Sequence, residues 1–219
     1  MSSIADNVNN IRNELSSYEG RVIAVSKYVT TKEMIGAYEA GLRDLAEGKA
    51  QDALAKIESL PEEMKKACTW HFVGHLQTNK VKKIVGNFDY IHSVDSLKLA
   101  EAIDNFAKDK GLIQKVLLQV NIAGEESKFG FSPKELFEVF PDIIKLKNIS
   151  VEGLMSMAPY SDNEALVASV FADTRGVKEK LECTFGVALK ELSMGMSNDY
   201  IIAAKEGSTM LRIGTKIFK

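Results

Sequence analysis

Short runs rich in β-branched and other apolar residues alternate with longer amphipathic runs along this chain. The short runs cover residues 22–28, 43–46, 70–74, 90–94, 116–122, 151–157, 192–196 and 210–214. Between them, apolar residues recur at helical spacing over residues 31–40, 50–59, 78–85, 96–108, 133–145, 163–182 and 199–206. This alternation favours a parallel α/β sheet, and eight such units in 219 residues favour closure into a single (β/α)8 TIM-type barrel over an open doubly wound sheet. The run at 43–46 is the weakest because it is short and half polar.

An extra amphipathic helix is predicted before the first strand. Its apolar residues are Ile4, Val8, Ile11 and Leu15. Ser3 followed by Asp6 resembles a capping box, and Gly20 is a plausible stop. Other expected boundary marks are Thr31, Ser96 and Ser132-Pro133 at helix starts, and Gly111 and Gly207 at helix ends. No repeat or linker interrupts the pattern, so residues 1–219 are expected to form one domain.

The composition is that of a globular domain, with 45% hydrophobic and 26% charged residues. A net charge of −2 without a basic stripe gives no reason to expect nucleic acid or an anionic membrane as a partner. The N-terminus lacks the pattern of a signal peptide, and no apolar run approaches the roughly 20 residues of a membrane span. We therefore expect a cytoplasmic protein whose Cys68 and Cys183 are reduced thiols.

Lys27 stands at the end of the first strand-like run, where a barrel carries its active site. The period of two along a strand places Ile23, Val25 and Lys27 on one face. If that face is the inner one, the amine lies at the barrel mouth. A partly desolvated lysine loses its proton more easily and becomes a nucleophile toward a carbonyl. By spacing alone, a lysine that leaves the strand and points into solvent is the more common arrangement.

Arg212 interrupts the last apolar run. Burial of an unpaired guanidinium is costly, so an inward Arg212 should meet an anion or another acceptor. The alternative is an outward arginine paired with a carboxylate on a helix, and the sequence pattern does not decide between the two.

Two segments suited to a phosphate group follow the last two strand-like runs. Residues 193–199 lead from a strand into a helix and offer backbone N–H groups, a hydroxyl and a helix dipole, and Gly214-Thr215 offers a close backbone approach and a second hydroxyl. Barrels commonly bind phosphate beside strands seven and eight. With Lys27 and Arg212, these segments predict a ligand that has a phosphate, an imine-forming carbonyl and a polar ring atom. Pyridoxal 5′-phosphate (PLP) meets all three requirements.

Other polar residues favour structural roles. His71 and His75 share a strand-like run, but no cysteine or carboxylate cluster completes a metal site, so we expect core or mouth positions for both and no metal. His92 stands alone and is expected to be structural. Met194 and Met196 alternate with small residues, which makes core packing their default role.

Seven segments, in order along the chain, resemble the YggS/PROSC family of pyridoxal-phosphate-binding homeostasis proteins. They are AVSK at 24–27, HFVGHLQTNK at 71–80, QVNI at 119–122, SKFG at 127–130, GLM at 153–155, LSMGMS at 192–197 and GSTMLRIGT at 207–215. The chain departs from the family at Gly48, where the family commonly has asparagine or serine, and at its end, where the family usually has glycine after Ile-Phe.

The resemblance implies a fold similar to the N-terminal barrel of alanine racemase, with PLP held as a Schiff base on Lys27. It implies that Ser197, Gly214 and Thr215 hold the phosphate, that the Met196 region contributes backbone, and that Arg212 faces the pyridine nitrogen. Because an arginine cannot accept the proton of a protonated ring, the electron sink is weak and a non-catalytic carrier is favoured. Expected partners are PLP and PLP-dependent apo-enzymes, and the expected state is a monomer.

Two other functions stay open from the sequence. A single-domain, PLP-dependent amino-acid racemase would need an acid or base opposite Lys27. A Schiff-base aldolase acting on a sugar phosphate would also combine a lysine, a phosphate site and a barrel.

Overall fold

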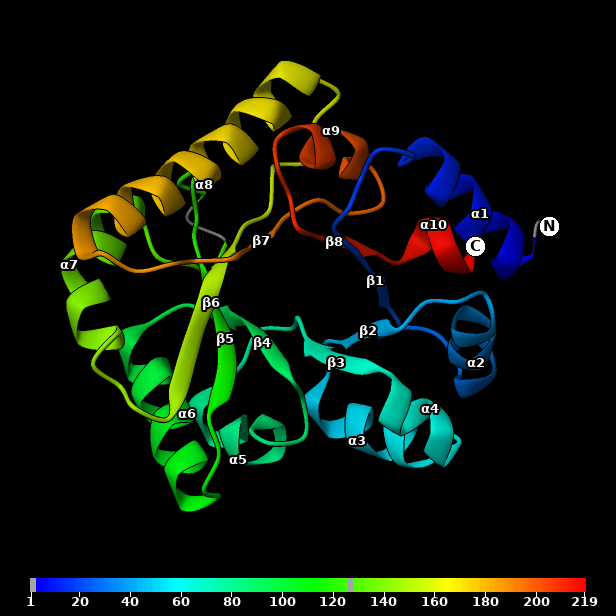
Figure 1. Cartoon of the computed structure of the whole chain (residues 1–219), viewed down its shortest axis with the longest axis horizontal. Coiled ribbons are helices and arrows are strands. Elements are labelled where there is room, and N and C mark those ends of the chain that lie inside the picture. Colours follow the sequence, from blue (N-terminus) through cyan, green and yellow to red (C-terminus); the bar gives the residue numbers. More distant parts are fainter. Residues whose placement is uncertain (1–2, 126–127) are drawn as a thin grey trace.

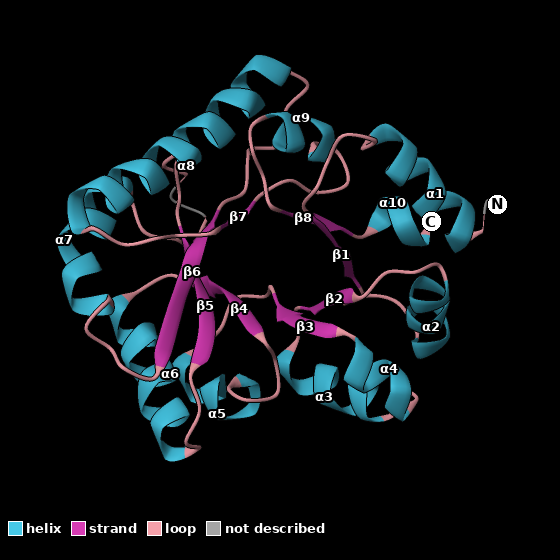
Figure 2. Cartoon of the chain, in the orientation of Figure 1, coloured by secondary structure: helices cyan, strands magenta, loops and turns pink. Residues whose placement is uncertain are grey.

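The protein, described here by a computed structural model over residues 3–125 and 128–219, is built around a closed barrel. Within those residues eight parallel strands follow one another around the ring in chain order, and β8 pairs with β1 to close it. Helices surround the ring on its outside (Figures 1 and 2). The prediction of a (β/α)8 barrel is confirmed.

The strands are β1 (Arg21–Val25), β2 (Asp44–Glu47), β3 (Thr69–Phe72), β4 (Tyr90–Val94), β5 (Gln114–Gln119), β6 (Ile149–Met155), β7 (Glu191–Ser193) and β8 (Met210–Ile213). The helices are α1 (Ile4–Glu14), α2 (Thr31–Glu39), α3 (Ala50–Glu58), α4 (Glu62–Ala67), α5 (Val81–Ile84), α6 (Leu97–Asp109), α7 (Pro133–Ile143), α8 (Glu164–Phe185), α9 (Tyr200–Lys205) and α10 (Thr215–Phe218). A 3-10 turn, η1 (Thr78–Lys80), leads into α5.

Alternate strand residues face the barrel interior and the surrounding helices. The interior holds a compact buried cluster formed by Ile23, Ala46, Tyr90, Leu117, Met155 and Met210. The intervening residues, such as Ala24 and Leu211, belong to the larger apolar layer between the strands and the helices. The inward face of β1 is therefore the one that carries Ile23 and Val25, which the sequence had left open.

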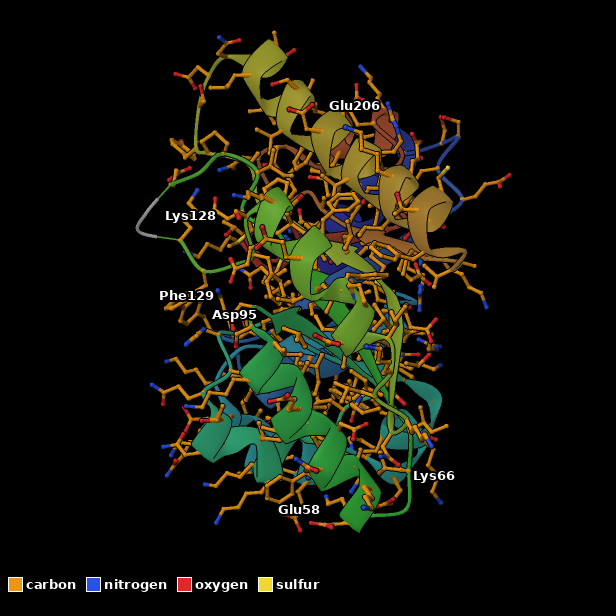
Figure 3. All side chains as sticks on the ribbon, turned by 90° about the vertical axis from the view of Figure 1, so that its left-hand side faces the viewer. Glu58, Lys66, Asp95, Lys128, Phe129 and Glu206 are labelled. Carbon is orange, nitrogen blue, oxygen red and sulfur yellow. The ribbon has the colours of Figure 1, made fainter. Side chains whose placement is uncertain are left out.

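The carboxyl ends of the strands meet at one end of the barrel. Figure 3 shows Asp95, which follows β4, close to Lys128 and Phe129, which follow β5, at one edge of the molecule. Lys66, in the helix that precedes β3, lies toward the opposite edge. Side chains that follow strand ends consequently gather at a common mouth, as in other parallel barrels.

Several predicted helix boundaries are confirmed. Ser3 and Asp6 form the expected capping box, and Ser96 and Ser132 cap α6 and α7. Thr30, not Thr31, caps α2. Gly111 and Gly207 have positive φ angles of 66° and 89° directly after the residues that cap α6 and α9.

Gly20 does not stop a helix, because α1 ends at Glu14. A Cβ on Gly20 would lie 2.7 Å from the carbonyl oxygen of Thr209, so the absence of a side chain lets the segment before β1 pass close to the backbone before β8.

Two short helices have no counterpart in the sequence prediction. The first, α4, has six residues and buries only Met64, which gives no helical period to detect. The second, α10, has four residues and follows β8 directly. It lies beside α1, so the two chain ends are neighbours (Figure 1). The Asn7 side-chain amide in α1 donates to the carbonyl of Ile217 in α10 at 3.0 Å.

In the part of the chain that the structure describes, the helices are each too short or too polar to cross a bilayer.

Candidate functional site

Lys27 lies at the barrel mouth, two residues beyond the end of β1. The backbone N–H of Ser26 still donates to Ala46 at 2.8 Å, so the chain leaves the sheet only at Lys27. The Lys27 side chain passes Gly48, where an added Cβ would stand 3.2 Å from Cδ of the lysine. Lys27 follows the face of β1 that carries Ile23 and Val25, but its side chain is exposed, as in the solvent-pointing alternative, and the protein's own side chains do not provide the expected partial desolvation.

The glycines after β2 and β3 shape the space beside Lys27. Gly48 and Gly74 approach each other so closely that a Cβ on Gly74 would overlap the carbonyl oxygen of Gly48. Gly48 therefore presents bare backbone to the lysine, at the position where the resembled family has a polar side chain. A ligand at this point would meet the backbone of Gly48 and Gly74 and the Lys27 side chain.

A buried ion pair supports the segment that carries Lys27. Glu47 is 1% exposed and accepts hydrogen bonds from the Ser26 hydroxyl at 2.8 Å and from Lys56 Nζ at 2.6 Å. Lys56 Nζ also donates to the Ser26 carbonyl at 2.7 Å. Sequence reasoning missed this group, although Glu47 directly follows an apolar run.

Arg212 is buried inside the barrel, with 5% of its surface exposed. Its Nη1 donates to Ser193 Oγ at 2.7 Å and its Nη2 donates to the Ser156 carbonyl at 2.9 Å. Burial lowers the pKa of the guanidinium to about 10, against the opposing effect of the Asp199 carboxylate, so Arg212 stays charged at neutral pH. The outward alternative is wrong, and the expected acceptors are two serines.

The segments after β7 and β8 come together beside this arginine. Gly195 has a φ of 92°, which favours glycine, and its carbonyl accepts from the Arg212 backbone N–H at 2.9 Å. Beyond it, the Ser197 hydroxyl accepts from the backbone N–H groups of Gly214 at 3.2 Å and Lys216 at 3.3 Å. Two N–H groups thus converge on one oxygen at the start of α10.

A cavity of about 300 Å³ opens at this point. It is lined by Asn7, Asn10, Ser197, Asn198, Thr215, Lys216 and Lys219. Ser197 and the exposed Thr215 are the predicted phosphate residues that border it. The Ser197 and Thr215 hydroxyls and the lysine side chains form a donor set that suits an anion, whereas the N–H groups of Gly214 and Lys216 already donate to Ser197 Oγ.

Met196 and Met194 differ in environment. Met194 is fully buried, as predicted. Met196 is 38% exposed, so core packing is wrong for it, because β7 ends at Ser193 and the period of two no longer applies. The Met196 backbone N–H donates to the Asp199 carboxylate, whose pKa burial raises above the ordinary aspartate value. That N–H is therefore engaged within the loop.

The three histidines fall into two groups. His71 and His92 are buried and hydrogen-bonded to each other, so His92 does not stand alone as expected. His75 lies at the mouth, where Nδ1 is 3.2 Å from Asp95 and the ring stacks on Phe129 with centroids 3.7 Å apart. Figure 3 shows Asp95 and Phe129 near each other. The described residues contain no group of three or more His, Cys, Asp or Glu placed to hold a metal.

The donors at the mouth fit PLP by their chemistry. Lys27 offers an amine, Arg212 a buried guanidinium, and Ser197 and Thr215 hydroxyls for a phosphate; the Gly214 N–H beside them donates to Ser197 Oγ. β1 pairs with β8 and β8 pairs with β7, so the lysine and the two phosphate segments follow three successive strands of the ring. Ser127, which belongs to one resemblance segment, lies outside the described residues.

The features above are those of a (β/α)8 protein suited to a phosphorylated carbonyl compound: a closed barrel, the Lys27 amine and an anion cradle formed by the residues around Ser197 and Thr215. Residues 1–219 match the sequence profile of the alanine racemase N-terminal domain, and the chain belongs to that family. A protein of Aquifex aeolicus named pyridoxal phosphate homeostasis protein is 39% identical over 90% of this chain and 86% of its own. One of Schizosaccharomyces pombe with the same name is 34% identical over 100% of this chain and 93% of its own.

Solved structures agree. PipY of Synechococcus elongatus, with PLP bound, is 37% identical, covers 99% of this chain and 100% of its own, and superposes with a TM-score of 0.90. Alanine racemase of Clostridium difficile superposes with a TM-score of 0.81 at 16% identity, and 98% of this chain matches 56% of that enzyme. The second likeness concerns the fold alone.

Proposed function

We propose that this protein binds PLP and serves in its homeostasis, holding the cofactor as a Schiff base on Lys27 without turning over a substrate. One observation carries the proposal: the Lys27 amine after β1 lies beside the Gly48 backbone, while β8, which pairs with β1, carries the buried Arg212. The anion cradle around Ser197 follows β7 and β8. The names of the relatives and the PLP in the PipY structure support it.

Each residue would have one role. Lys27 would hold the cofactor by its aldehyde carbon through a C=N bond to the side-chain nitrogen, with the aldehyde oxygen released as water. Ser197, Gly214 and Thr215 bind the phosphate, the loop at Met196 borders it, and Arg212 donates toward the pyridine nitrogen. The cofactor, when bound, supplies an electrophilic carbon and an electron-withdrawing ring.

The chemistry of Arg212 supports holding over turnover. A charged guanidinium is a donor only, so it cannot take up the proton of a protonated pyridine ring. The ring then stays a weak electron sink, and carbanion chemistry at a bound amino acid gains little. We propose PLP-dependent apo-enzymes of the cytoplasm as recipients, a setting with which the free thiols Cys68 and Cys183 are compatible.

Absorbance spectroscopy of purified protein with added PLP tests the proposal. We expect a visible band that Lys27→Ala abolishes. Lys49→Ala is the matched control, because Lys49 Nζ and Lys27 Nζ lie 5.3 Å and 5.1 Å from the centroid of the same Tyr28 ring. A protein that stays colourless with excess PLP, or a band that survives in Lys27→Ala, would refute the assignment.

Two further measurements separate the alternative functions. Borohydride reduction followed by mass spectrometry should place a PLP adduct on Lys27, whereas an aldolase would carry a triose unit. Solvent deuterium should not enter the α-position of amino acids above background. Rapid incorporation would identify a racemase-like enzyme.

A further inference from the structure

A continuous line of polar side chains crosses the barrel interior. It begins at Asp44, the first residue of β2, and runs through His71 on β3 and His92 on β4 to Ser193 on β7 and Arg212 on β8. Figure 2 shows that β2, β3 and β4 face β7 and β8 across the ring. The successive contacts are 2.9 Å, 2.9 Å, 2.8 Å and 2.7 Å long.

The donors and acceptors of this line can be assigned from its arginine end. A guanidinium only donates, so Ser193 Oγ accepts from Arg212 and its own hydrogen is free to point to Nδ1 of His92. Nδ1 of His92 is then an acceptor, and the ring proton lies on Nε2, which donates to Nδ1 of His71.

The same assignment follows from the other end. A carboxylate only accepts, so Nε2 of His71 carries a proton that it donates to Asp44. Nδ1 of His71 is left as the acceptor, in agreement with the assignment from Arg212. All four hydrogen bonds point from the guanidinium to the carboxylate, and both histidines are neutral with the proton on Nε2.

Burial of this line of side chains requires that each of its donors and acceptors has a partner. His71, His92 and Ser193 have no exposed surface, and the buried ring of Tyr90 stacks on His71 with centroids 5.1 Å apart. An unpaired donor or acceptor would be costly in such a place. Burial also lowers the pKa of both histidine rings, which favours their neutral forms.

Charged groups stand at the two ends and leave the middle neutral. Asp44 lies 3.9 Å from Arg21, and Arg21 is also paired with Glu191 at the start of β7. Arg212 has Asp199 as the nearby carboxylate at the mouth. The hydrogen-bonded line therefore connects an acidic group at the beginning of a strand with the guanidinium near the site.

We propose that Asp44, His71, His92 and Ser193 are positioning residues that hold Arg212 in one orientation through a one-way hydrogen-bond relay. Each donor in such a relay polarises the next bond, so Ser193 becomes a stronger acceptor for the guanidinium than an isolated hydroxyl. The relay thereby keeps Arg212 a charged, fixed donor toward the site. Its effect on a bound ligand rests on the proposed function, in which the pyridine nitrogen meets Arg212.

Nitrogen NMR of histidine in the protein without PLP tests the relay itself. At pH 7.5, we expect His71 and His92 to be neutral and to carry their protons on Nε2. Asp89→Asn is the matched control, because Asp89 is a second carboxylate near His71 that accepts instead from the Trp70 backbone N–H at 2.7 Å. A proton on Nδ1 of either ring, or a charged ring at this pH, would overturn the assignment.

Asp44→Asn and Ser193→Ala test the effect of the relay on the site, since neither residue is proposed to touch PLP. We expect the dissociation constant of PLP to rise about 3-fold in Asp44→Asn and about 10-fold in Ser193→Ala, with no change in Asp89→Asn. A weaker donor at the pyridine nitrogen withdraws less charge, so the pH midpoint of the visible band should move to higher pH in both variants.

The outcomes separate the relay from the proposed function. Wild-type protein that binds no PLP would refute the function, while the histidine spectra would still decide the relay. If wild type binds PLP and both variants keep its affinity and its pH midpoint, the positioning role is wrong. Asp44→Asn alone suffices if Ser193→Ala does not fold.

Discussion

At the scale of single residues, the stability of this protein depends strongly on the partners of the buried Glu47 carboxylate. It depends on Lys56, whose side chain is 21% exposed, and on the hydroxyl of Ser26. Removing one partner of a buried pair costs much more than removing both, because a lone buried charge has lost its hydration without compensation. The pair also holds the backbone next to Lys27 through the Ser26 carbonyl.

We therefore predict that Lys56→Met lowers the free energy of unfolding by about 3 kcal/mol, as expected for breaking such a pair. Urea denaturation at pH 7.5 measures it. The double variant with Glu47→Gln should recover part of the loss, because an amide is cheaper to bury than a carboxylate. Equal losses in the single and double variants would show that the charge of Glu47 is not the cause.

Residue-scale chemistry was only partly predictable from the sequence. The inward direction of the Arg212 face was open because an arginine in a strand can face either way, and packing decided it. His92 seemed isolated because its partners, His71 and Ser193, are 21 and 101 positions away in the chain. A search for polar residues at inward positions of the predicted strands would have found all three.

At the scale of elements, close strand contacts depend on single glycines. A Cβ on Gly153 in β6 would overlap the carbonyl oxygen of Glu191 in β7. Both atoms belong to rigid paired strands, since Gly153 and Glu191 are partners in the sheet register. Gly176 in α8 is the opposite case, with no atom within 4 Å of its added Cβ.

Gly153→Ala should thus destabilise the protein by about 2 kcal/mol or more through overpacking. Gly176→Ala should stabilise it by about 0.5–1 kcal/mol, because alanine loses less conformational freedom in a helix. Thermal unfolding of the two variants beside wild type provides the comparison. Shifts of the same sign would contradict the packing argument.

The order of the strands and the positions of several helix caps were predictable, but other element ends were not. β1 ends at Val25, three residues before the end of the predicted run at residue 28, because the chain turns after the Ser26 N–H bonds to Ala46. In α10, the short segment after Gly214 becomes a helix where the Ser197 hydroxyl accepts its first N–H groups. Both ends depend on contacts with residues far along the chain.

At the scale of the whole molecule, two neutral histidines in the core couple stability to pH. His71 faces Asp44, Arg21 and Asp89, and His92 faces His71 and Arg212. Burial lowers both pKa values below the ordinary histidine value of 6.5. Below that pH the unfolded chain takes up protons that the folded protein excludes, so the free energy of unfolding falls as the pH falls.

We predict a loss approaching 1.4 kcal/mol per pH unit for each histidine below about pH 6.5. Urea denaturation at pH 7.5, 6.5 and 5.5 measures it in a range above the ordinary titration of carboxylates. A free energy that stays constant across this range would mean that the histidines titrate normally in the folded protein, and one that rises toward pH 5.5 would mean that folding raises their pKa values; either result contradicts the prediction.

The sequence by itself determined the alternation of eight strands with helices, because periodicity is a local property that each segment carries alone, and the number of these units favoured closure into a barrel. It also singled out Lys27, Arg212 and the segments around Ser197 and Gly214, since their types conflict with an apolar strand end. Tertiary structure alone decided which side chains meet. Hydrogen bonds such as those from Asp44 to Arg212 join residues that only the closed ring brings within 3 Å of one another.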